Sequence, residues 1–559
     1  MRHQNTNKPA TDRVDNHATT SSIDENVVGS LQVRLQPKVK CAKGFLEPEI
    51  PEDDKLNCSI SEAYNNDTER WERDKCHMHP VTNGTCSNAT VPCTHGWWYN
   101  PDPIQTSVVT DWDLVCDKNF LPELSQTIFN VGVMAGAILF GFLSDKYGRK
   151  KIFITALLAQ TLVGSVTSAS PNFYFYTALR FLVGALEQGV NITGFIMATE
   201  LFPPKERSVA AVSHEFFWAI GGAVLPFFAY YLRQWRHLQL VVSLPSALSI
   251  ILIWTIPESL VWLLAKGRIK EAEAILGKAA SMNKKTLPPN CLSDHDTKPI
   301  LPDGTQTQDI RIESKEQRTY TVIDLFRTPK LRKISMCICM LWALNTMVYY
   351  GLTFNTPNLY GDMYLNFFLG QLVEIPSVMA TLFLIYKVGR RWPLCLFHVF
   401  GGLVCIASPF IPATTAGGTD LTWLAVTLAM LGKFAINASF TIIYLYGPEI
   451  YPTVIRNTGA GLASFSGRIG GILYPPVTYL SKLDTPLAKQ LPLIVFGTLS
   501  VIGGFTALPL PETRHMPLPD TIDDVENYEE FCKRAKHHAN GTAYEMTNVV
   551  DGKQQPERV

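Results

Sequence analysis

Long apolar runs separated by short polar joints dominate the sequence between Leu121 and Leu510. Each run has roughly 20 residues, enough for a helix that crosses about 30 Å of hydrocarbon. There are about eleven such runs, near residues 122–144, 152–170, 173–200, 209–232, 237–256, 332–354, 363–386, 392–412, 420–447, 457–480 and 490–510. The composition agrees, because 47% hydrophobic and only 18% charged residues would be unusual in a soluble protein of 559 residues. The sequence therefore predicts an all-α polytopic membrane protein.

The basic residues indicate which joints face the cytoplasm. Lys and Arg gather in 144–151, 203–208, 257–333, 386–391 and the tail after Pro511. Because cytoplasmic joints carry an excess of basic residues, we place these segments and the C-terminus in the cytoplasm. The alternate joints at 168–172, 355–362 and 412–420 contain no Lys or Arg, whereas 233–237 and 481–490 carry two bases each and depart slightly from the rule.

Cysteines and glycosylation sequons cluster before the first apolar run. Six of the twelve cysteines lie there, at Cys41, Cys58, Cys76, Cys86, Cys93 and Cys116, together with sequons at Asn57, Asn66, Asn83 and Asn88. This combination favours an extracellular, oxidised and glycosylated loop, and hence a location in the plasma membrane. The disulfide pairing does not follow from the sequence. The other cysteines fall in predicted cytoplasmic or membrane segments, and we expect them to be reduced.

These patterns divide the chain into six segments. They are a polar N-terminal segment (1–45), the extracellular loop (46–121), an N-terminal helical bundle (122–256), a cytoplasmic linker (257–331), a C-terminal six-helix bundle (332–510) and a cytoplasmic tail (511–559). Within the linker, residues 257–285 interleave charged residues with Leu, Ile and Ala, a pattern typical of an amphipathic helix.

Three short motifs occur once in each half of the chain, in the same order. The pairs are Gly148-Arg149-Lys150 with Gly389-Arg390-Arg391, Glu200-Leu-Phe-Pro with Glu449-Ile-Tyr-Pro, and Pro257-Glu258-Ser259 with Pro511-Glu512-Thr513. All six copies stand at predicted cytoplasmic helix ends. Such a repeat predicts two pseudo-symmetric helical bundles in parallel orientation, which is how the halves of a major facilitator transporter are related.

The charged residues of these motifs are candidates for a cytoplasmic gate. They are Asp145, Arg149, Glu200, Arg207, Arg390, Glu449 and Arg456. The Glu200–Arg207 and Glu449–Arg456 pairs are the expected salt bridges, within one half or between halves. Asp145 is expected to cap a helix end or to pair with Arg149, and Tyr386 replaces it in the second copy, so the gate should be asymmetric. The alternative is a plain basic turn at the inner surface.

Longer motifs make the sequence similar to one known family. They include TDWDLVCD (110–117), GFLSDKYGRKK (141–151), PESLVWLLAKGR (257–268), GLTFNTPNLYGD (351–362), VEIP (373–376), PTVIRNTG (452–459) and PLPDTID (517–523). The chain resembles the organic ion transporter family, solute carrier family 22, of the major facilitator superfamily. Within it, TPNLYGD, VEIP, PTVIRN and PLPDTID are most similar to organic cation/carnitine transporters. The resemblance implies transport of organic cations and zwitterions such as carnitine by alternating access, driven by a sodium gradient or the membrane potential.

Arg468 is a fixed positive charge inside a predicted membrane helix. Because a charge at bilayer depth is costly, it normally faces a partner or a watery cavity, so Arg468 either contacts substrate or forms a structural ion pair. The resemblance favours substrate, since organic anion and carnitine transporters carry an arginine here and cation-selective members an acidic residue. A carboxylate on the substrate could then accept charge-assisted hydrogen bonds from the guanidinium.

Other intramembrane residues extend this candidate site. Trp342, Tyr349 and Tyr350 could supply an aromatic wall for a quaternary ammonium group, or could face lipid or other helices. Lys433 is a second candidate for the anionic end of a substrate. Glu374 could face the cation or stabilise a helix kinked at the VEIP proline. Finally, Glu215 could contact an ammonium group or a proton.

The N-terminal segment departs from the family pattern. Residues 1–45 contain no apolar run long enough for a span and no signal-peptide core. Family members have a further helix before the extracellular loop, so we expect the first family helix to be missing. This leaves two alternatives to a carnitine-type carrier, an organic anion exchanger of the same family and a transport-inactive isoform.

The sequence also argues against several classes of protein. No nucleophile with its base, nucleotide-binding loop or metal-ligand spacing stands out, so we expect neither an enzyme nor a bound cofactor beyond coupled Na⁺. The formal net charge of 0 gives no support for nucleic-acid binding. The expected partners are a small organic cation or zwitterion and the lipid bilayer, and the oligomeric state stays open.

Overall fold

The computed structural model describes two thirds or more of the chain, in several stretches. They are 39–41, 62–65, 70–73, 76–78, 81–82, 85–86, 91–93, 97–99, 106–202, 207–285 and 321–532, apart from 357, 358, 360, 413, 416, 484–486, 489, 515 and 517. Several predictions fall outside these residues. They concern the first family helix, the Arg207 side chain and the glycosylation of Asn57, Asn66, Asn83 and Asn88.

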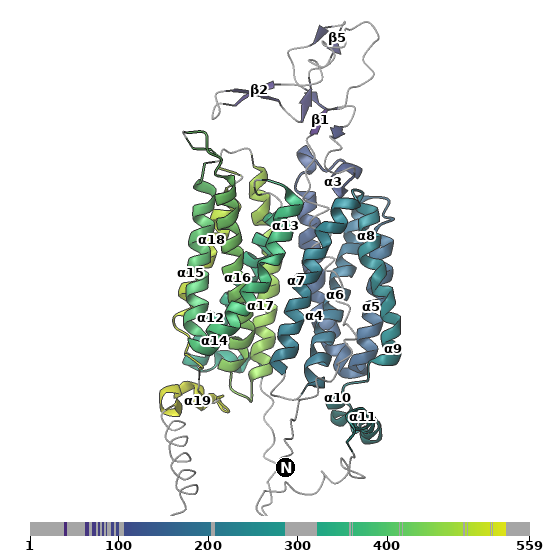
Figure 1. The fold of residues 1–559 in the computed structure, drawn as a ribbon, viewed down its shortest axis with the longest axis vertical. Coiled ribbons are helices and arrows are strands. Elements are labelled where there is room, and N and C mark those ends of the chain that lie inside the picture. The colour runs from purple at the N-terminus through teal and green to yellow at the C-terminus, as the bar shows by residue number, and fades with distance from the viewer. Residues whose placement is uncertain are drawn as a thin grey trace, which may run out of the picture.

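Five helical segments form the N-terminal half (Figure 1). They are α4 (Leu121–Tyr147), α5 (Arg149–Thr167), α6 (Phe173–Leu201), α7 (Arg207–Tyr231) and a composite of α8 (Trp235–Ser243), η2 (Leu244–Ile251) and α9 (Leu252–Thr255). Each coincides with one apolar run of the sequence. The chain changes direction between α4 and α5 at Gly148, whose φ of 105° is accessible chiefly to glycine.

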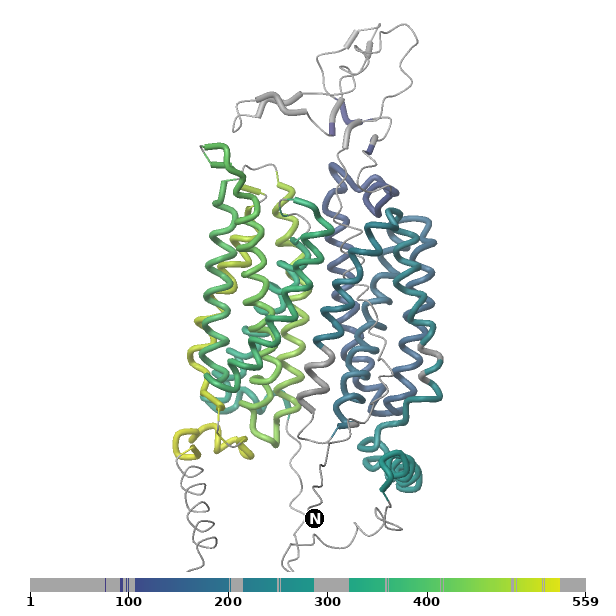
Figure 2. The backbone as a smooth tube through the Cα atoms, viewed as in Figure 1, coloured from purple at the N-terminus to yellow at the C-terminus, as the bar shows by residue number. Residues whose placement is uncertain are grey.

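Six described helical segments form the C-terminal half. They are α12 (Pro329–Asn355), α13 (Met363–Leu372) continued by α14 (Glu374–Lys387), α15 (Arg391–Ala407), α16 (Thr422–Ile450), α17 (Arg456–Tyr479) and α18 (Leu491–Ala507). Short 3₁₀ turns follow α15 (η6, Ser408–Phe410) and α17 (η7, Leu480–Lys482). Among the described residues, seven helical segments are both long and apolar enough to cross a membrane. The helices run roughly parallel in two adjacent bundles (Figures 1 and 2).

One end of the bundles, which we name the strand end, carries the cysteine-rich segment (Figure 1). Its strands form four antiparallel pairs: β1 (Val39–Cys41) with β8 (Trp97–Tyr99), β2 (Glu62–Asn65) with β3 (Arg70–Arg73), β4 (His77–Met78) with β7 (Val91–Pro92), and β5 (Val81–Thr82) with β6 (Thr85–Cys86). Two short helices follow, α3 (Val108–Asp111) and η1 (Cys116–Lys118). A Cys76–Cys116 disulfide ties the strands to η1.

Side chains also fasten the strand end to the N-terminal half. The Asp111 carboxylate accepts hydrogen bonds from Trp235 Nε1 (2.9 Å) and Arg236 Nε (3.1 Å) at the start of α8. Arg236 also donates to the carbonyl oxygens of Ser168 and Ser170 between α5 and α6. Arg236 is therefore compensated where it stands.

The opposite end, which we name the motif end, carries the short helices α10 (Leu260–Ala265), α11 (Ile269–Met282), η4 (Val322–Phe326) and α19 (Ile522–Glu526). The predicted linker helix is thus two helices, which meet at Gly267 with φ 69°. In the C-terminal half, Glu526 accepts hydrogen bonds from the backbone N–H groups of Lys330 (3.0 Å) and Leu331 (3.1 Å). Because these are donors of the first turn of α12, the segment after α18 caps that helix.

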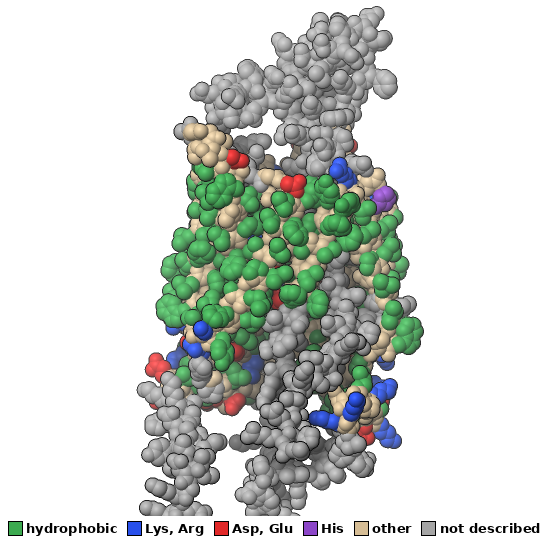
Figure 3. All heavy atoms as spheres, viewed as in Figure 1, with side chains coloured by type: hydrophobic (Ala, Val, Ile, Leu, Met, Phe, Trp, Pro, Cys, Tyr) green, Lys and Arg blue, Asp and Glu red, His purple; other side chains and the backbone are tan. Residues whose placement is uncertain are grey.

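On the face that Figure 3 shows, most of the coloured side chains at mid-height are apolar, and most of the charged ones lie toward the two ends. Large apolar residues face outward along the helices, among them Ile138 (66% exposed) and Trp254 (75% exposed). A soluble protein would hide such groups, whereas a membrane protein presents them to lipid. The fold is therefore that of an all-α polytopic membrane protein.

The two halves touch mainly near the strand end. An apolar cluster there combines Leu225 and Leu238 of the N-terminal half with Phe354, Phe367 and Tyr474 of the C-terminal half. We name the contact surface between the two halves the seam. The helices in contact across it are α4 with α17 and α7 with α13. Among the described residues, the apolar clusters nearer the motif end each belong to one half. The molecule is thus closed at the strand end.

Candidate functional site

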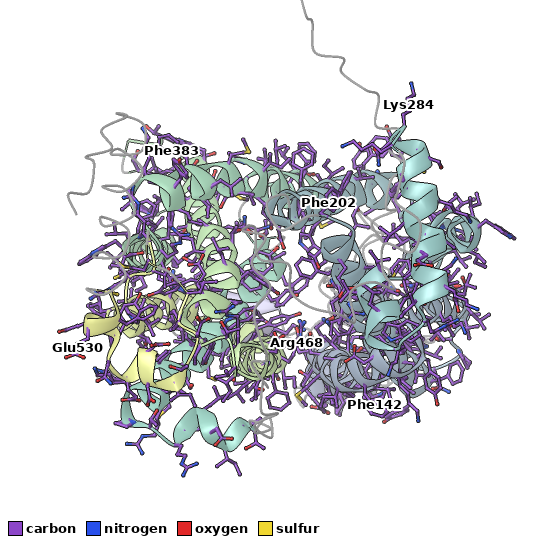
Figure 4. The ribbon with its side chains drawn as sticks, turned by 90° about the horizontal axis from the view of Figure 1, so that it is seen from below. Phe142, Phe202, Lys284, Phe383, Arg468 and Glu530 are labelled. Atoms are coloured by element: carbon purple, nitrogen blue, oxygen red, sulfur yellow. A yellow bond between two sulfur atoms is a disulfide. The ribbon has the colours of Figure 1, made fainter. Side chains whose placement is uncertain are left out.

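Arg468 lies on α17, near the middle of the view from the motif end (Figure 4). Its side chain is half-buried, and it makes no hydrogen bond or ion pair with the described part of the chain. The helix packs closely on α12, because a Cβ on Gly467 would lie 3.0 Å from Thr346 Oγ1 and one on Gly470 would lie 2.0 Å from Ala343 O. The glycines on either side of Arg468 therefore allow α17 to pack closely on α12. The structural ion pair that was one of the two expectations for Arg468 is not formed among the described residues.

Four aromatic rings from α12 and α16 form one group beside α17. Trp342 lies 4.5 Å from Tyr444 and 6.4 Å from Phe440, between ring centroids. Phe440 also stacks on Tyr349 at 5.1 Å and contacts Tyr444 at 5.1 Å. Trp342 is 7% exposed and Tyr349 5%, so neither ring faces lipid. We name Trp342, Tyr349, Phe440 and Tyr444 the aromatic group.

Tyr350 lies apart from this group. It stacks on Phe354 and Tyr474, each at 5.8 Å between centroids, in the apolar cluster that joins the halves. The reason is helical geometry, since residues seven apart such as Trp342 and Tyr349 share a face, whereas Tyr350 is turned by about 100° from Tyr349.

Lys433 and Glu374 form a buried ion pair. Lys433 Nζ lies 3.0 Å from Glu374 Oε1, and each residue is 2% exposed. Glu374 begins α14 after the break at Val373, where a helix N-terminus favours a negative charge. The Tyr349 hydroxyl donates to both carboxylate oxygens, at 3.1 and 3.2 Å. Both charges are therefore compensated inside the C-terminal half.

A hydrogen bond to Tyr349 connects this pair to the other half. Trp218 Nε1, on α7, donates to the Tyr349 hydroxyl at 3.2 Å. Glu215 is half-buried one turn earlier on α7 and lies within electrostatic range of Tyr349, Glu374 and Tyr444. Tyr444 is in turn within range of Arg468. Glu215 of the N-terminal half and Arg468 of the C-terminal half thus both lie within electrostatic range of Tyr444.

At the motif end of the N-terminal half, the three motifs meet. The Glu258 carboxylate accepts hydrogen bonds from the backbone N–H groups of Arg149 (3.0 Å) and Lys150 (2.9 Å), at the start of α5. The Arg149 guanidinium forms an ion pair with Glu200 and lies 3.7 Å from Asp145. The expected Asp145–Arg149 pairing is therefore present.

The second copies of the motifs meet in the same way in the C-terminal half. Glu512 accepts from the backbone N–H groups of Arg390 (2.9 Å) and Arg391 (3.1 Å), and Arg390 forms an ion pair with Glu449 at 3.1 Å. A Cβ on Gly389 would lie 2.8 Å from the Glu512 carboxylate. The glycine of the motif is therefore required by the capping carboxylate that packs against it.

This arrangement corrects the expected salt bridges. Glu449 pairs with Arg390, while Arg456 donates to the Tyr451 carbonyl and to Thr453 Oγ1, both at 3.2 Å. The Glu449–Arg456 prediction is wrong because α16 ends at Ile450 and a turn separates the two side chains. In the first copy Glu200 pairs with Arg149. Among the described residues, these motif contacts stay within one half.

Comparison with known proteins identifies the family. The profile of the family "Sugar (and other) transporter" matches residues 85–521. An organic cation transporter protein of Drosophila melanogaster is 36% identical over 491 residues, which cover 86% of this chain and 87% of that protein. Solute carrier family 22 member 13 of Homo sapiens is 36% identical over 439 residues, which cover 78% of this chain and 75% of that protein. The chain belongs to solute carrier family 22. The resemblance noted in the sequence is thereby confirmed.

Another family member is named for carnitine. Organic cation/carnitine transporter 2 of Homo sapiens is 34% identical over 465 residues, which cover 83% of this chain and 78% of that protein. Among solved structures, the inward open conformation of the xylose transporter XylE from E. coli matches with a TM-score of 0.54 at 15% identity. That match covers 74% of this chain and 90% of XylE. The fold and family are therefore those of major facilitator transporters and not of enzymes.

The sequence did not single out Phe440, Tyr444 or Trp218. Phe440 and Tyr444 follow Lys433 along α16 and are spaced by four residues, so they share a face. A search for aromatics on the helix of an intramembrane charge would have found them. Trp218 stands three residues after Glu215, and the same search would have found it too.

Proposed function

We propose that this chain transports organic cations and zwitterions such as carnitine across the plasma membrane by alternating access. The observation that carries the proposal is the contrast between two intramembrane cations. Lys433 is compensated by Glu374, whereas Arg468 makes no ion pair with the described residues. A guanidinium at this depth favours an anionic group, and a substrate carboxylate would supply it.

The surroundings of Arg468 support a zwitterionic substrate over a plain anion. The aromatic group can bind a quaternary ammonium through its ring faces. Glu215 adds negative charge from the other half, within range of Tyr444. Arg468 Nε and Trp342 Nε1 are buried without acceptors among the described residues, and an acceptor on the substrate would satisfy them. Relatives named as organic cation and carnitine transporters agree with this chemistry.

The arrangement of the halves supports a rocking mechanism. The seam between α4 and α17 is closed at the strand end, and Arg468 lies on α17 itself. Binding at Arg468 would therefore act directly on a helix that lines the seam. We place the motif end and the C-terminus in the cytoplasm, following the basic residues gathered there. The membrane potential, worth about 2.3 kcal/mol per charge per 100 mV, or a sodium gradient would drive uptake.

The test is uptake of labelled carnitine, tetraethylammonium and an aromatic carboxylate in cells that express this chain, with its surface amount measured in parallel. We expect sodium- or potential-dependent uptake of the first two. Arg468→Asp should weaken carnitine uptake at least about tenfold, the loss expected for a charge-assisted hydrogen bond, and spare tetraethylammonium more. Arg468→Lys, which keeps the charge, should lose less.

Two outcomes would replace the proposal. Uptake of the aromatic carboxylate alone would identify an organic anion exchanger. Binding of carnitine without uptake, despite normal surface protein, would identify a transport-inactive member of the family. Unchanged carnitine affinity in Arg468→Asp would show that Arg468 does not contact the carboxylate.

A further inference from the structure

The structure contains a second buried ion pair, at the strand end. Unlike Lys433–Glu374, this pair joins the two halves. Lys482, in η7 after α17, places Nζ 2.9 Å from Oε1 and 3.0 Å from Oε2 of Glu123, in the first turn of α4. The same ammonium donates to the Asn119 carbonyl at 3.2 Å. The two side chains are only 10% and 7% exposed. Lys482 of the C-terminal half therefore contacts the first turn of α4 in the N-terminal half.

This pair differs from the ion pairs described above. Those pairs lie within one half, such as Arg149–Glu200, Arg390–Glu449 and Lys433–Glu374. Glu123–Lys482, in contrast to these pairs, crosses the seam. It also accounts for Lys482, one of the bases that departed from the positive-inside pattern, because its charge is neutralised in place.

The seam continues tightly below the pair. Asn130, two turns further along α4, lies against α17, where a Cβ on Gly471 would be 3.8 Å from Asn130 Oδ1. On the parallel seam between α7 and α13, the rings of Tyr230 and Tyr364 are 5.6 Å apart. Arg468 lies one turn beyond Gly471 toward the motif end. The path from the strand end to Arg468 is thus closed by contacts that begin at Glu123 and Lys482.

We propose that Glu123 and Lys482 are positioning residues that lock the strand-end entrance, and that their separation is a required step of each transport cycle. The inference rests on the alternating access described above. Opening the entrance pulls α4 from α17, so the two charges must part and be hydrated separately. Because removing one partner of a buried pair leaves an uncompensated charge, the lock favours the closed entrance and is sensitive to either residue.

The test measures opening directly, without any substrate. Asn130→Cys places a reporter thiol inside the closed seam, and a membrane-impermeant thiol reagent is applied to intact cells from the strand side. We expect Lys482→Met or Glu123→Gln to raise the labelling rate roughly tenfold. The exchanged pair Glu123→Lys with Lys482→Glu should restore slow labelling. The parent chain without the reporter cysteine gives the background.

Two further variants distinguish loss of the lock from a general loss of folded structure. The neutral pair Glu123→Gln with Lys482→Met leaves no unpaired buried charge, and it should reach the surface normally and still label fast. Arg236→Met removes an ion pair at the same end but within one half, and it should leave labelling slow. Equal labelling in all variants at matched surface amounts would overturn the proposal, as would fast labelling of the exchanged pair. Because the labelling assay needs no substrate, it tests the lock even if the chain does not take up carnitine.

Discussion

Replacing Lys433 by Met should destabilise the C-terminal half far more than replacing both members of its ion pair. The single variant keeps the apolar stem and removes the ammonium, so the Glu374 carboxylate loses its counter-ion in a site where it is 2% exposed and must either stay charged without it or take up a proton. The double variant Lys433→Met with Glu374→Gln removes both charges, and the glutamine can still accept the hydrogen bond from Tyr349.

The size of the effect follows from the burial and the geometry. Breaking a buried pair by removing one partner costs about 3–5 kcal/mol. Glu374 would keep the Tyr349 hydrogen bond at 3.1 Å, which places the expected loss near the lower bound, at about 3 kcal/mol. For a cooperative unit of about 200 residues this lowers Tm by roughly 6–12 °C. The double variant should stay within about 1 kcal/mol of the parent, or roughly 3 °C.

The assay is thermal unfolding of the solubilised, fluorescently tagged protein, followed by size-exclusion chromatography after heating. Lys387→Met is the matched control, since Lys387 is exposed at the end of α14 and the substitution is the same. It should leave Tm unchanged. A Lys433→Met protein that melts within about 2 °C of the parent would refute the reasoning, and so would a double variant that melts as low as the single one.

Three further outcomes test the packing, a cap and the motif end. Gly470→Ala should cost about 1–3 kcal/mol and reduce folded surface protein, because its Cβ would collide with Ala343 O, whereas Gly461→Ala meets open space and should be neutral or stabilising in the same melting assay. Glu526→Ala should lower stability by about 1 kcal/mol through loss of the α12 cap, and an unchanged Tm would contradict that role. Arg390→Met should slow uptake roughly tenfold at matched surface amounts, and uptake within twofold of the parent would argue against a part in gating.

The sequence predicted the helices well and the charge pairs less well. Each apolar run became a helix because the hydrocarbon requires a continuous apolar segment, which can be read from consecutive residues. The repeat was equally readable, since Gly389 and Glu512 recur at the positions of Gly148 and Glu258. Their contact explains the repeat, because the capping carboxylate packs against the glycine in both halves.

Pairings between distant residues could not be obtained in this way. The sequence suggested Glu449 with Arg456, which are close along the chain, whereas the observed partner Arg390 is 59 residues away. Lys433 and Glu374 were both singled out as substrate ligands, yet their mutual contact depends on how α14 leans on α16. Only the packing of helices decides which of several intramembrane charges is left for a ligand.

The hydrogen bond from Trp218 to Tyr349 has a thermodynamic consequence. Tyr349 is one wall of the aromatic group, and its hydroxyl also receives a hydrogen bond from Trp218 on α7. A ligand that displaces this ring would alter the free energy of contact between the halves. By linkage, a ligand that binds one arrangement of the halves more tightly shifts the equilibrium toward that arrangement by the ratio of its two affinities, and a change in the populations of the two arrangements changes the apparent ligand affinity. Binding of a ligand and the arrangement of the two halves would therefore be coupled through the side chain of Tyr349.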